Sequence, residues 1–171
     1  STVVSNGTLG GSGSLAGGLA VVSGATLAAG NSIGTFTVNG AASLGGTVVA
    51  EITNGPSADL INFAGGATLG GTLSVVANGT LTSGQTFNLF DGSLSGTFGT
   101  VNLPGGPAHW NTSALYTAGE ITFANASPVA SDFGLGVAVG GSVTAPVVGK
   151  YVSDADGDAV TITSVSTPAN G

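Results

Sequence analysis

The chain has no cysteine and no methionine, a single basic side chain, and few aromatic residues (6 %). The lack of cysteine excludes disulfide bonds and thiolate chemistry. Lys150 is the only Lys or Arg against eight acids, so the net charge is −7 and the chain cannot neutralise phosphates. We therefore exclude nucleic acid as a partner. No apolar run approaches the roughly 18–20 residues that span a bilayer, so we expect no membrane insertion.

Glycine is abundant, with 32 residues, and the hydrophobic share of 42 % comes mostly from Ala, Val and Leu. Each glycine costs conformational entropy on folding, so the chain needs an architecture that satisfies its backbone through regular repetition. Small apolar side chains suit thin core layers. The low charge argues against a chain that is disordered through self-repulsion.

Internal repeats indicate which architecture this is. Asn6–Gly11, Ala42–Thr47 and Ala67–Thr72 share a Leu-Gly-Gly pattern, and the last two lie 25 residues apart, within the period range of solenoids. Alternating apolar and polar residues predict short strands between the repeats, at 34–38, 47–52, 60–63 and 72–76. No stretch has helical periodicity, so we expect almost no helix.

Four Asn-Gly pairs mark predicted corners at which the glycine adopts a positive φ. They are Asn6-Gly7, Asn39-Gly40, Asn54-Gly55 and Asn78-Gly79. The same dipeptide closes β-hairpins through type I′ turns, so a sandwich of hairpins is the alternative. The repeats favour a β-solenoid for residues 1–125.

One long motif resembles a known repeat. The sequence resembles bacterial autotransporter-type β-helical passenger repeats over about residues 6–124. The similar elements include Leu27–Gly40, Gly84–Asp91 and Trp110–Tyr116. Leu44–Thr47 and Asp59–Asn62 carry the same likeness. The resemblance implies a right-handed parallel β-helix that acts as a stalk or shaft, with no catalytic residues to carry over.

The composition changes after Phe123, and Pro128 enters a different segment. This segment resembles the opening half of bacterial Ig-like or cadherin-like tandem modules. The residues that carry the likeness are Pro128–Asp132, Gly141–Thr144 and Asp154–Thr163. The expected fold is therefore all-β: a right-handed parallel β-helix (1–125) followed by a partial Ig-like β-sandwich (126–171). Half a sandwich exposes strand edges, so we expect this part to pair with a neighbouring copy, head to tail.

Asp154, Asp156 and Asp158 place three of the eight acids within five residues, around Gly157. Calcium takes six to eight oxygen ligands, and such a loop can bring several carboxylates to one ion. These three residues are the predicted metal site, and calcium is the predicted cofactor. The alternative is an acidic turn whose carboxylates cap local amides.

Other chemically active side chains have structural interpretations. We predict that His109 and Trp110 cap the end of the solenoid core, since no partner suggests a catalytic role for the histidine. Phe87, Phe90 and Phe98 are predicted to stack under the last coils. A glycosidase needs two carboxylates about 5–10 Å apart. Glu51, Asp59, Asp91 and Glu120 are single acids that are separated in sequence.

These features predict a non-enzymatic extracellular structural protein, a surface shaft or the subunit of a self-assembling filament. Its expected partner is a second copy, joined head to tail by strand pairing. One alternative is a cell-surface adhesin that binds a glycan or a protein. Another is a polysaccharide-degrading β-helix enzyme. Scarce charge and the absence of cysteine favour an extracellular or cell-surface location.

Overall fold

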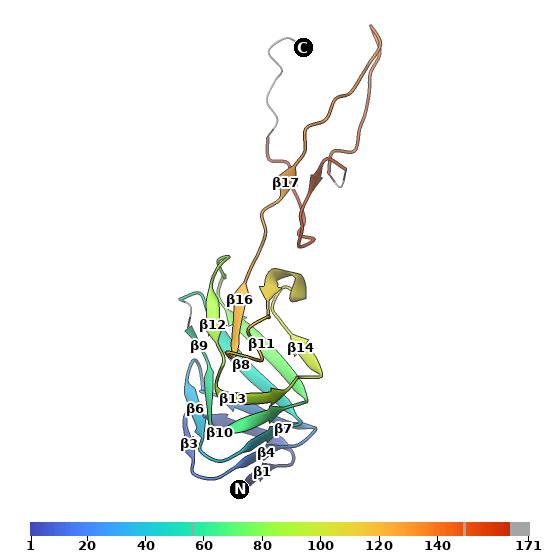
Figure 1. Ribbon diagram of the computed structural model, residues 1–171. Helices are drawn as coiled ribbons and strands as arrows, with labels where there is room; N and C mark the ends of the chain where they lie inside the picture. Colours follow the sequence, from blue (N-terminus) through green and yellow to red (C-terminus); the bar gives the residue numbers. More distant parts are fainter. Residues whose placement is uncertain (56, 149, 165–171) are drawn as a thin grey trace. The chain divides into compact units, whose positions relative to one another are not determined.

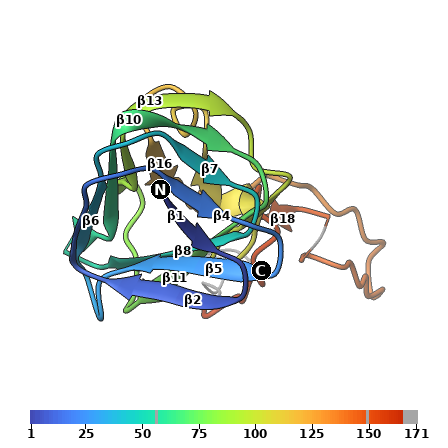
Figure 2. The same ribbon diagram turned by 90° about the horizontal axis from the view of Figure 1, so that it is seen from below.

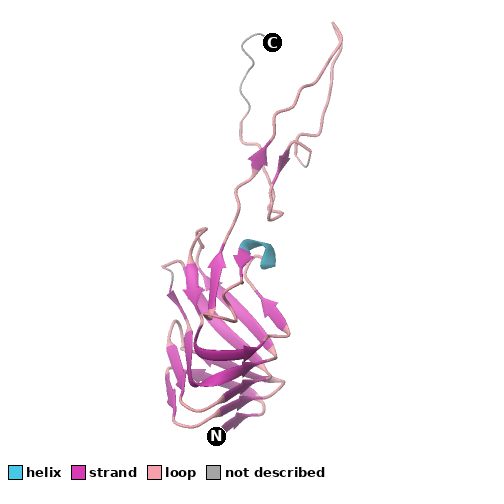
Figure 3. Cartoon of the chain, in the orientation of Figure 1, coloured by secondary structure: helices cyan, strands magenta, loops and turns pink. Residues whose placement is uncertain are grey.

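The computed structural model describes residues 1–55, 57–148 and 150–164 (Figures 1 and 3). The chain divides into two compact units, Ser1–Asn125 and Ala126–Gly171. Strands dominate, and the described residues contain one short 3₁₀ helix, η1 (Pro107–His109). No described helix has the length and hydropathy required to traverse a bilayer. The expectation of an almost helix-free, all-β chain is confirmed.

The first unit is a three-sided solenoid of about four turns, built from three stacks of parallel strands (Figure 2). Stack A consists of β1 (Thr2–Val4), β4 (Leu19–Val21), β7 (Ala42–Leu44), and the ends of β10 (Leu60–Leu69) and β13 (Phe90–Gly96). Stack B consists of β2 (Gly7–Gly11), β5 (Ala25–Ala29), β8 (Thr47–Thr53), β11 (Thr72–Asn78) and β14 (Thr100–Asn102). Stack C consists of β3 (Gly13–Leu15), β6 (Thr35–Val38) and the beginnings of β10 and β13.

The chain visits stacks A, B and C in turn and then begins the next coil. Coil 1 thus contains β1 to β3, coil 2 contains β4 to β6, and coil 3 contains β7, β8 and the beginning of β10. β10 then bends around a corner, where its register with β13 shifts between Phe63 and Ala67, and continues as the first strand of coil 4. The prediction of a parallel β-solenoid is confirmed.

The coils lengthen toward the C-terminal end of the solenoid. Five threonines, each the first or second residue of a stack B strand, lie in register, and the spacing between neighbours rises from 18 residues to 21, 25 and 28. The extra residues form corner loops. One of them, after Asn54-Gly55, is a hairpin in which β9 (Ser57–Ala58) pairs antiparallel with β8. The hairpin alternative therefore holds at this corner alone among the four predicted ones.

The predicted positive φ occurs at two of the four Asn-Gly corners, Gly7 (72°) and Gly79 (115°). Gly40 and Gly55 have no positive φ, so the prediction was wrong at these two corners. A Cβ atom at Gly40 would lie 2.5 Å from the backbone nitrogen of Gly18 in the coil below. Glycine is needed at this corner because two coils approach closely.

Inward side chains form ladders along the axis of the solenoid. One ladder runs through Leu9, Leu27, Val48, Leu73 and Val101, each in register with the next. The three central members are completely buried. Full burial of one such side chain contributes about 1.5–3 kcal/mol. Ladders of this kind are the main source of stability in a chain with few large side chains.

A small antiparallel sheet closes the C-terminal end of the solenoid core. Its order is β12 (Thr86–Asn88), β16 (Glu120–Phe123) and β15 (Trp110–Asn111). Trp110 is 7 % exposed, lies edge-on to Phe123 at 5.2 Å between ring centroids, and donates a hydrogen bond from Nε1 to the Pro104 carbonyl at 2.8 Å. His109 is 8 % exposed and lies 6.3 Å from Phe123 between ring centroids, so the burial of both residues fits the predicted cap role, which stays a prediction.

The predicted aromatic stack is also present beneath this cap. Phe90 lies 6.1 Å from Phe63 and 5.8 Å from Phe98 between ring centroids, and Phe87 lies 6.1 Å from Trp110. The three predicted members are at most 6 % exposed.

The second unit has one described strand pair, β17 (Val129–Ala130) antiparallel to β18 (Val152–Ser153). Phe133 stacks on Tyr151 at 4.0 Å between ring centroids. Other large apolar residues of this unit are exposed, among them Leu135, Val137 and Val139. The described strands thus amount to one antiparallel pair, and the Ig-like sandwich stays a prediction.

Candidate functional site

The acidic loop folds around the carboxylate of Asp154. Its Oδ1 accepts hydrogen bonds from the backbone N–H groups of Asp156 (2.9 Å) and Asp158 (3.2 Å). Gly157 permits the bend with a φ of 84°. Asp156 accepts a hydrogen bond through Oδ2 from the backbone N–H of Ala126. Backbone N–H groups thus donate to the carboxylates of the loop, as the alternative interpretation of an acidic turn predicts.

The same loop was the predicted calcium site. Within residues 1–55, 57–148 and 150–164, no three His, Cys, Asp or Glu side chains converge in a way that would hold a metal ion. Asp154 Oδ2 is buried and has no hydrogen-bond partner among those residues. That oxygen is the one feature of the loop that a cation would explain, and calcium stays a prediction.

Asp59 is the buried charged residue of the solenoid, with 1 % of its surface exposed. Its Oδ1 accepts a hydrogen bond from Gly34 N–H at 2.9 Å, and its Oδ2 accepts one from Glu51 N–H at 2.9 Å. Burial raises the pKa of this carboxyl above its ordinary value of 3.8, and the two N–H groups offset part of that rise. Repulsion by the Glu51 carboxylate adds a smaller increase.

The position of Asp59 bears on the hydrolase alternative. Glu51 and Asp59 are neighbours, since Asp59 N–H also donates to the Glu51 carbonyl at 2.8 Å. Both oxygens of Asp59 are engaged by backbone amides inside the solenoid wall. A carboxylate held in this way is not placed to contact a substrate in solvent. The Glu51 side chain instead accepts a hydrogen bond from Asn78 Nδ2 at 3.2 Å, on the neighbouring strand.

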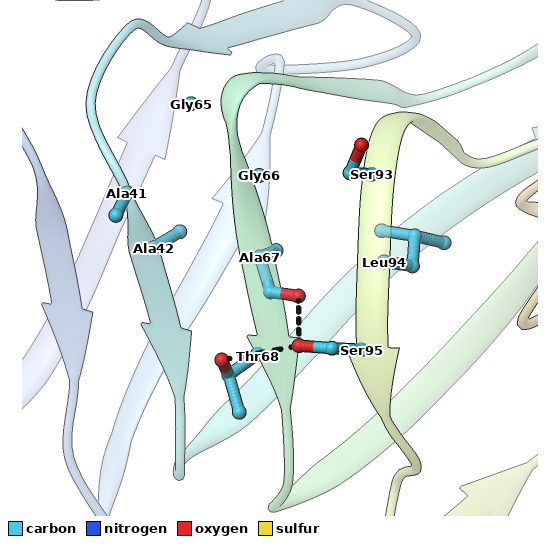
Figure 4. Close-up of a pocket in the computed structure, with 9 residues that line it drawn as sticks. All are labelled: Ala41, Ala42, Gly65, Gly66, Ala67, Thr68, Ser93, Leu94 and Ser95. Carbon is cyan, nitrogen blue, oxygen red and sulfur yellow. Dashed lines mark hydrogen bonds between the residues drawn. The ribbon is translucent and has the colours of Figure 1, made fainter.

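A shallow groove lies at the corner where the chain enters stack A. It is formed by the beginning of β7 and by the bends of β10 and β13 (Figure 4). Its volume is about 240 Å³, and Ala, Gly, Ser, Thr and Leu line it. Ser95 Oγ lies 3.2 Å from Thr68 Oγ1 and donates to the Ala67 carbonyl at 3.1 Å. Ligand sites usually occupy about 300–1,000 Å³ and have convergent polar groups. This groove is smaller, and neither charge nor an aromatic ring lines it.

The outer face of stack B carries a feature that sequence reasoning missed. Thr8, Thr26, Thr47, Thr72 and Thr100, here called the threonine column, lie in register on five neighbouring strands. Buried residues flank them, such as Ala25 and Leu27 beside Thr26, so the threonines point outward. The signal in the sequence was a threonine after Gly or Ala at the start of each of these strands.

A second outward column runs beside the first. It contains Gly10, Ala28, Val49, Ser74 and Asn102, again in register. This column varies in chemistry while the threonine column does not. The two columns together form the regular outer face of the solenoid on this side.

Comparisons with protein-family models, with curated proteins and with solved structures each return no match. The fold and the arrangement of its side chains therefore carry the functional argument.

Proposed function

We propose that this chain is a non-enzymatic extracellular structural protein, a shaft segment or filament subunit whose copies join head to tail by strand pairing. The ladders of the solenoid carry this proposal. Each inner strand pairs with a strand above and one below, so that hydrogen bonds and buried ladders run continuously along one axis. Such stacking resists bending and extension because each coil contacts only its neighbours and all contacts add along the axis.

The free edges support assembly between copies. Among the described residues, β1, β2 and β3 each pair with a single strand, on the side of coil 2. The inward residues of this coil, Val4, Leu9 and Leu15, remain half-buried. The opposite end of the core is covered by the antiparallel sheet described above. Direct stacking of two solenoid ends therefore lacks a second open end.

The second unit offers the complementary strand. Phe133, Leu135, Val137 and Val139 alternate with Gly and Ala, which is the pattern of a strand with one apolar face. Their side chains are between 43 % and 108 % exposed, and no described strand pairs with this segment. In the proposed assembly this segment adds as a strand to the open edge of the next copy. Contacts of this kind do not close on themselves and give filaments.

Family and location belong to the same proposal. We assign the first unit to the autotransporter-type β-helical repeats, and the second to the Ig-like or cadherin-like modules, on the motifs given above. A surface shaft on a bacterium fits a chain with one basic side chain and no cysteine.

Electron microscopy and sedimentation velocity of the purified chain test this function. We expect regular filaments whose formation depends on concentration. Val137→Asp with Val139→Asp should abolish them, because charges cannot enter an apolar strand interface. Val76→Asp, at an exposed position on β11 in coil 4, lies away from the open edge of coil 1, so it is the matched control and should leave filaments intact. A wild-type chain that stays a monodisperse monomer at all concentrations contradicts the proposal.

A further inference from the structure

We propose that the outer face of stack B binds the surface of ice, with the threonine column as the contacting row. Strands in a sheet lie about 4.7–4.9 Å apart, so the five threonines form a row with that repeat. Ice is an ordered lattice of water, and a regular, rigid row of side chains is what allows a protein surface to match such a lattice. The inference does not depend on filament formation.

The regularity of the row is not a by-product of a constant repeat. Successive threonines are 18, 21, 25 and 28 residues apart, yet all five lie in register. The neighbouring outward column, which has the same register, holds five different residue types. A threonine thus stands at one position of each coil although the coil length and the adjacent residues vary.

The chemistry of threonine suits ordered water. Each side chain presents a hydroxyl group that donates and accepts hydrogen bonds, beside a methyl group that orders water without binding it. Branching at Cβ restricts χ1, so the row loses little side-chain entropy when it meets a lattice. Completely buried neighbours, Leu27, Val48 and Leu73, fix the backbone beneath the three central threonines.

Other ligands fit this face poorly. Strands β2, β5, β8, β11 and β14 carry no basic residue, so they offer nothing to a phosphate or another anion. They carry no aromatic residue on which a sugar ring would stack. Glu51 is the one charged residue of these strands, and it lies in β8 four positions beyond Thr47. The threonine column itself carries no charge and presents only hydroxyl and methyl groups, which leaves water as its ligand.

The test is ice recrystallisation inhibition and thermal hysteresis, measured on the purified full chain. We expect the wild-type chain to slow crystal growth and to lower the freezing point below the melting point. Thr47→Lys and Thr72→Lys place a long charged side chain in the middle of the row and should abolish both effects. Thr37→Lys, at an outward position on stack C, is the matched control and should retain them.

A structural role for the column gives different results. Cross-strand threonine pairs stabilise sheets, so substitutions that only lower the melting temperature, with wild-type activity against ice, overturn the proposal. Thr47→Val keeps the shape and the β-branch and should fold normally while weakening the activity. A wild-type chain without effect on ice also overturns the proposal. So do Thr47 and Thr72 variants that change the sedimentation of the chain but not its activity against ice, because that result would identify the face as a contact between copies. Filaments without ice activity would leave the proposed function intact.

Discussion

Asp59 in coil 3 holds Gly34 in coil 2 through a hydrogen bond of 2.9 Å from the Gly34 N–H to Asp59 Oδ1. The second oxygen of the same carboxylate accepts the N–H of Glu51. One buried side chain therefore satisfies two backbone donors at the corner where two coils meet. In a chain with so few charged residues, this carboxylate has a defined structural role.

Replacing Asp59 tests that role. Asp59→Ala leaves the part-buried N–H groups of Gly34 and Glu51 without their acceptor, and each costs at most about 1–3 kcal/mol of unfolding free energy. Asp59→Asn keeps one acceptor and should be milder. Asp91→Ala removes an exposed carboxylate and is the matched control, with little effect. Urea denaturation of the three variants measures these changes, and equal stability of Asp59→Ala and Asp91→Ala contradicts the assignment.

The pH dependence of stability follows from the raised pKa of Asp59. Because the folded state holds this proton more tightly than the unfolded state, the contribution of Asp59 is most favourable below pH 3.8. It is lost as the pH rises through the folded pKa, and it stays constant above. The unfolding free energy of the wild type minus that of Asp59→Asn should therefore fall with rising pH. A difference that grows between acid and neutral pH contradicts this sign.

The apolar ladders predict large effects of truncation inside the solenoid. Leu73→Ala removes a completely buried member of the ladder and leaves a cavity between Val48 and Val101. Such changes cost about 2–5 kcal/mol. Val76→Ala on the same strand, where Val76 is 42 % exposed, should have little effect. Thermal melting followed by circular dichroism distinguishes the two, and similar losses would mean that Leu73 is not a core residue.

The aromatic cap is predicted to seal the last coil. Trp110→Ala should cost about 3–5 kcal/mol and increase amide exchange in β13 and β14, because the end of the core is opened. Trp110→Phe keeps an aromatic ring but loses the hydrogen bond to the Pro104 carbonyl, so the expected cost is near 0.5–1.5 kcal/mol. Unchanged exchange in these strands after Trp110→Ala would contradict the cap.

Calcium remains a prediction at the Asp154 loop, and it is tested by melting the chain with added calcium and with a chelator. A bound ion that ligates Asp154 Oδ2 should raise the melting temperature of the second unit, and Asp156→Asn should reduce that rise. If the ion and the chelator change nothing, the loop is an acidic turn. Asp154→Ala lowers stability in either case, because the N–H groups of Asp156 and Asp158 lose their acceptor.

The stacked strands were predictable because their signals are local. The 25-residue spacing of Ala42 and Ala67 is the register that the structure shows, since one coil adds one period. The third copy of the Leu-Gly-Gly pattern, Asn6–Gly11, occupies a different position in its coil. Its Leu9 belongs to the ladder of Val48 and Leu73 in stack B, whereas the leucines of the other two copies, Leu44 and Leu69, lie in stack A. Short apolar repeats do not reveal which corner of the coil they occupy.

The candidate sites were less predictable. Asp59 begins the Asp59–Asn62 element of the family resemblance, but that element does not indicate the role of the carboxylate. Its partner Gly34 lies one coil away, so only the register brings the two together. The threonine column was hidden for a related reason. The coils have unequal lengths, so the five threonines do not recur at a fixed spacing in the sequence. They align only in the folded chain, where the additional residues of the longer coils lie in corner loops.

Paired cysteines give the most direct test that the coils stack in this register, because the chain has no cysteine of its own. Val49 and Ser74 are in-register neighbours on β8 and β11, and Thr72 lies two residues away along β11. Disulfides need Cα atoms within about 4.4–6.8 Å of each other. Val49→Cys with Ser74→Cys should oxidise readily to an intramolecular disulfide, while Val49→Cys with Thr72→Cys should stay reduced. Efficient oxidation of the second pair, or failure of the first in a folded chain, would contradict the stacked solenoid.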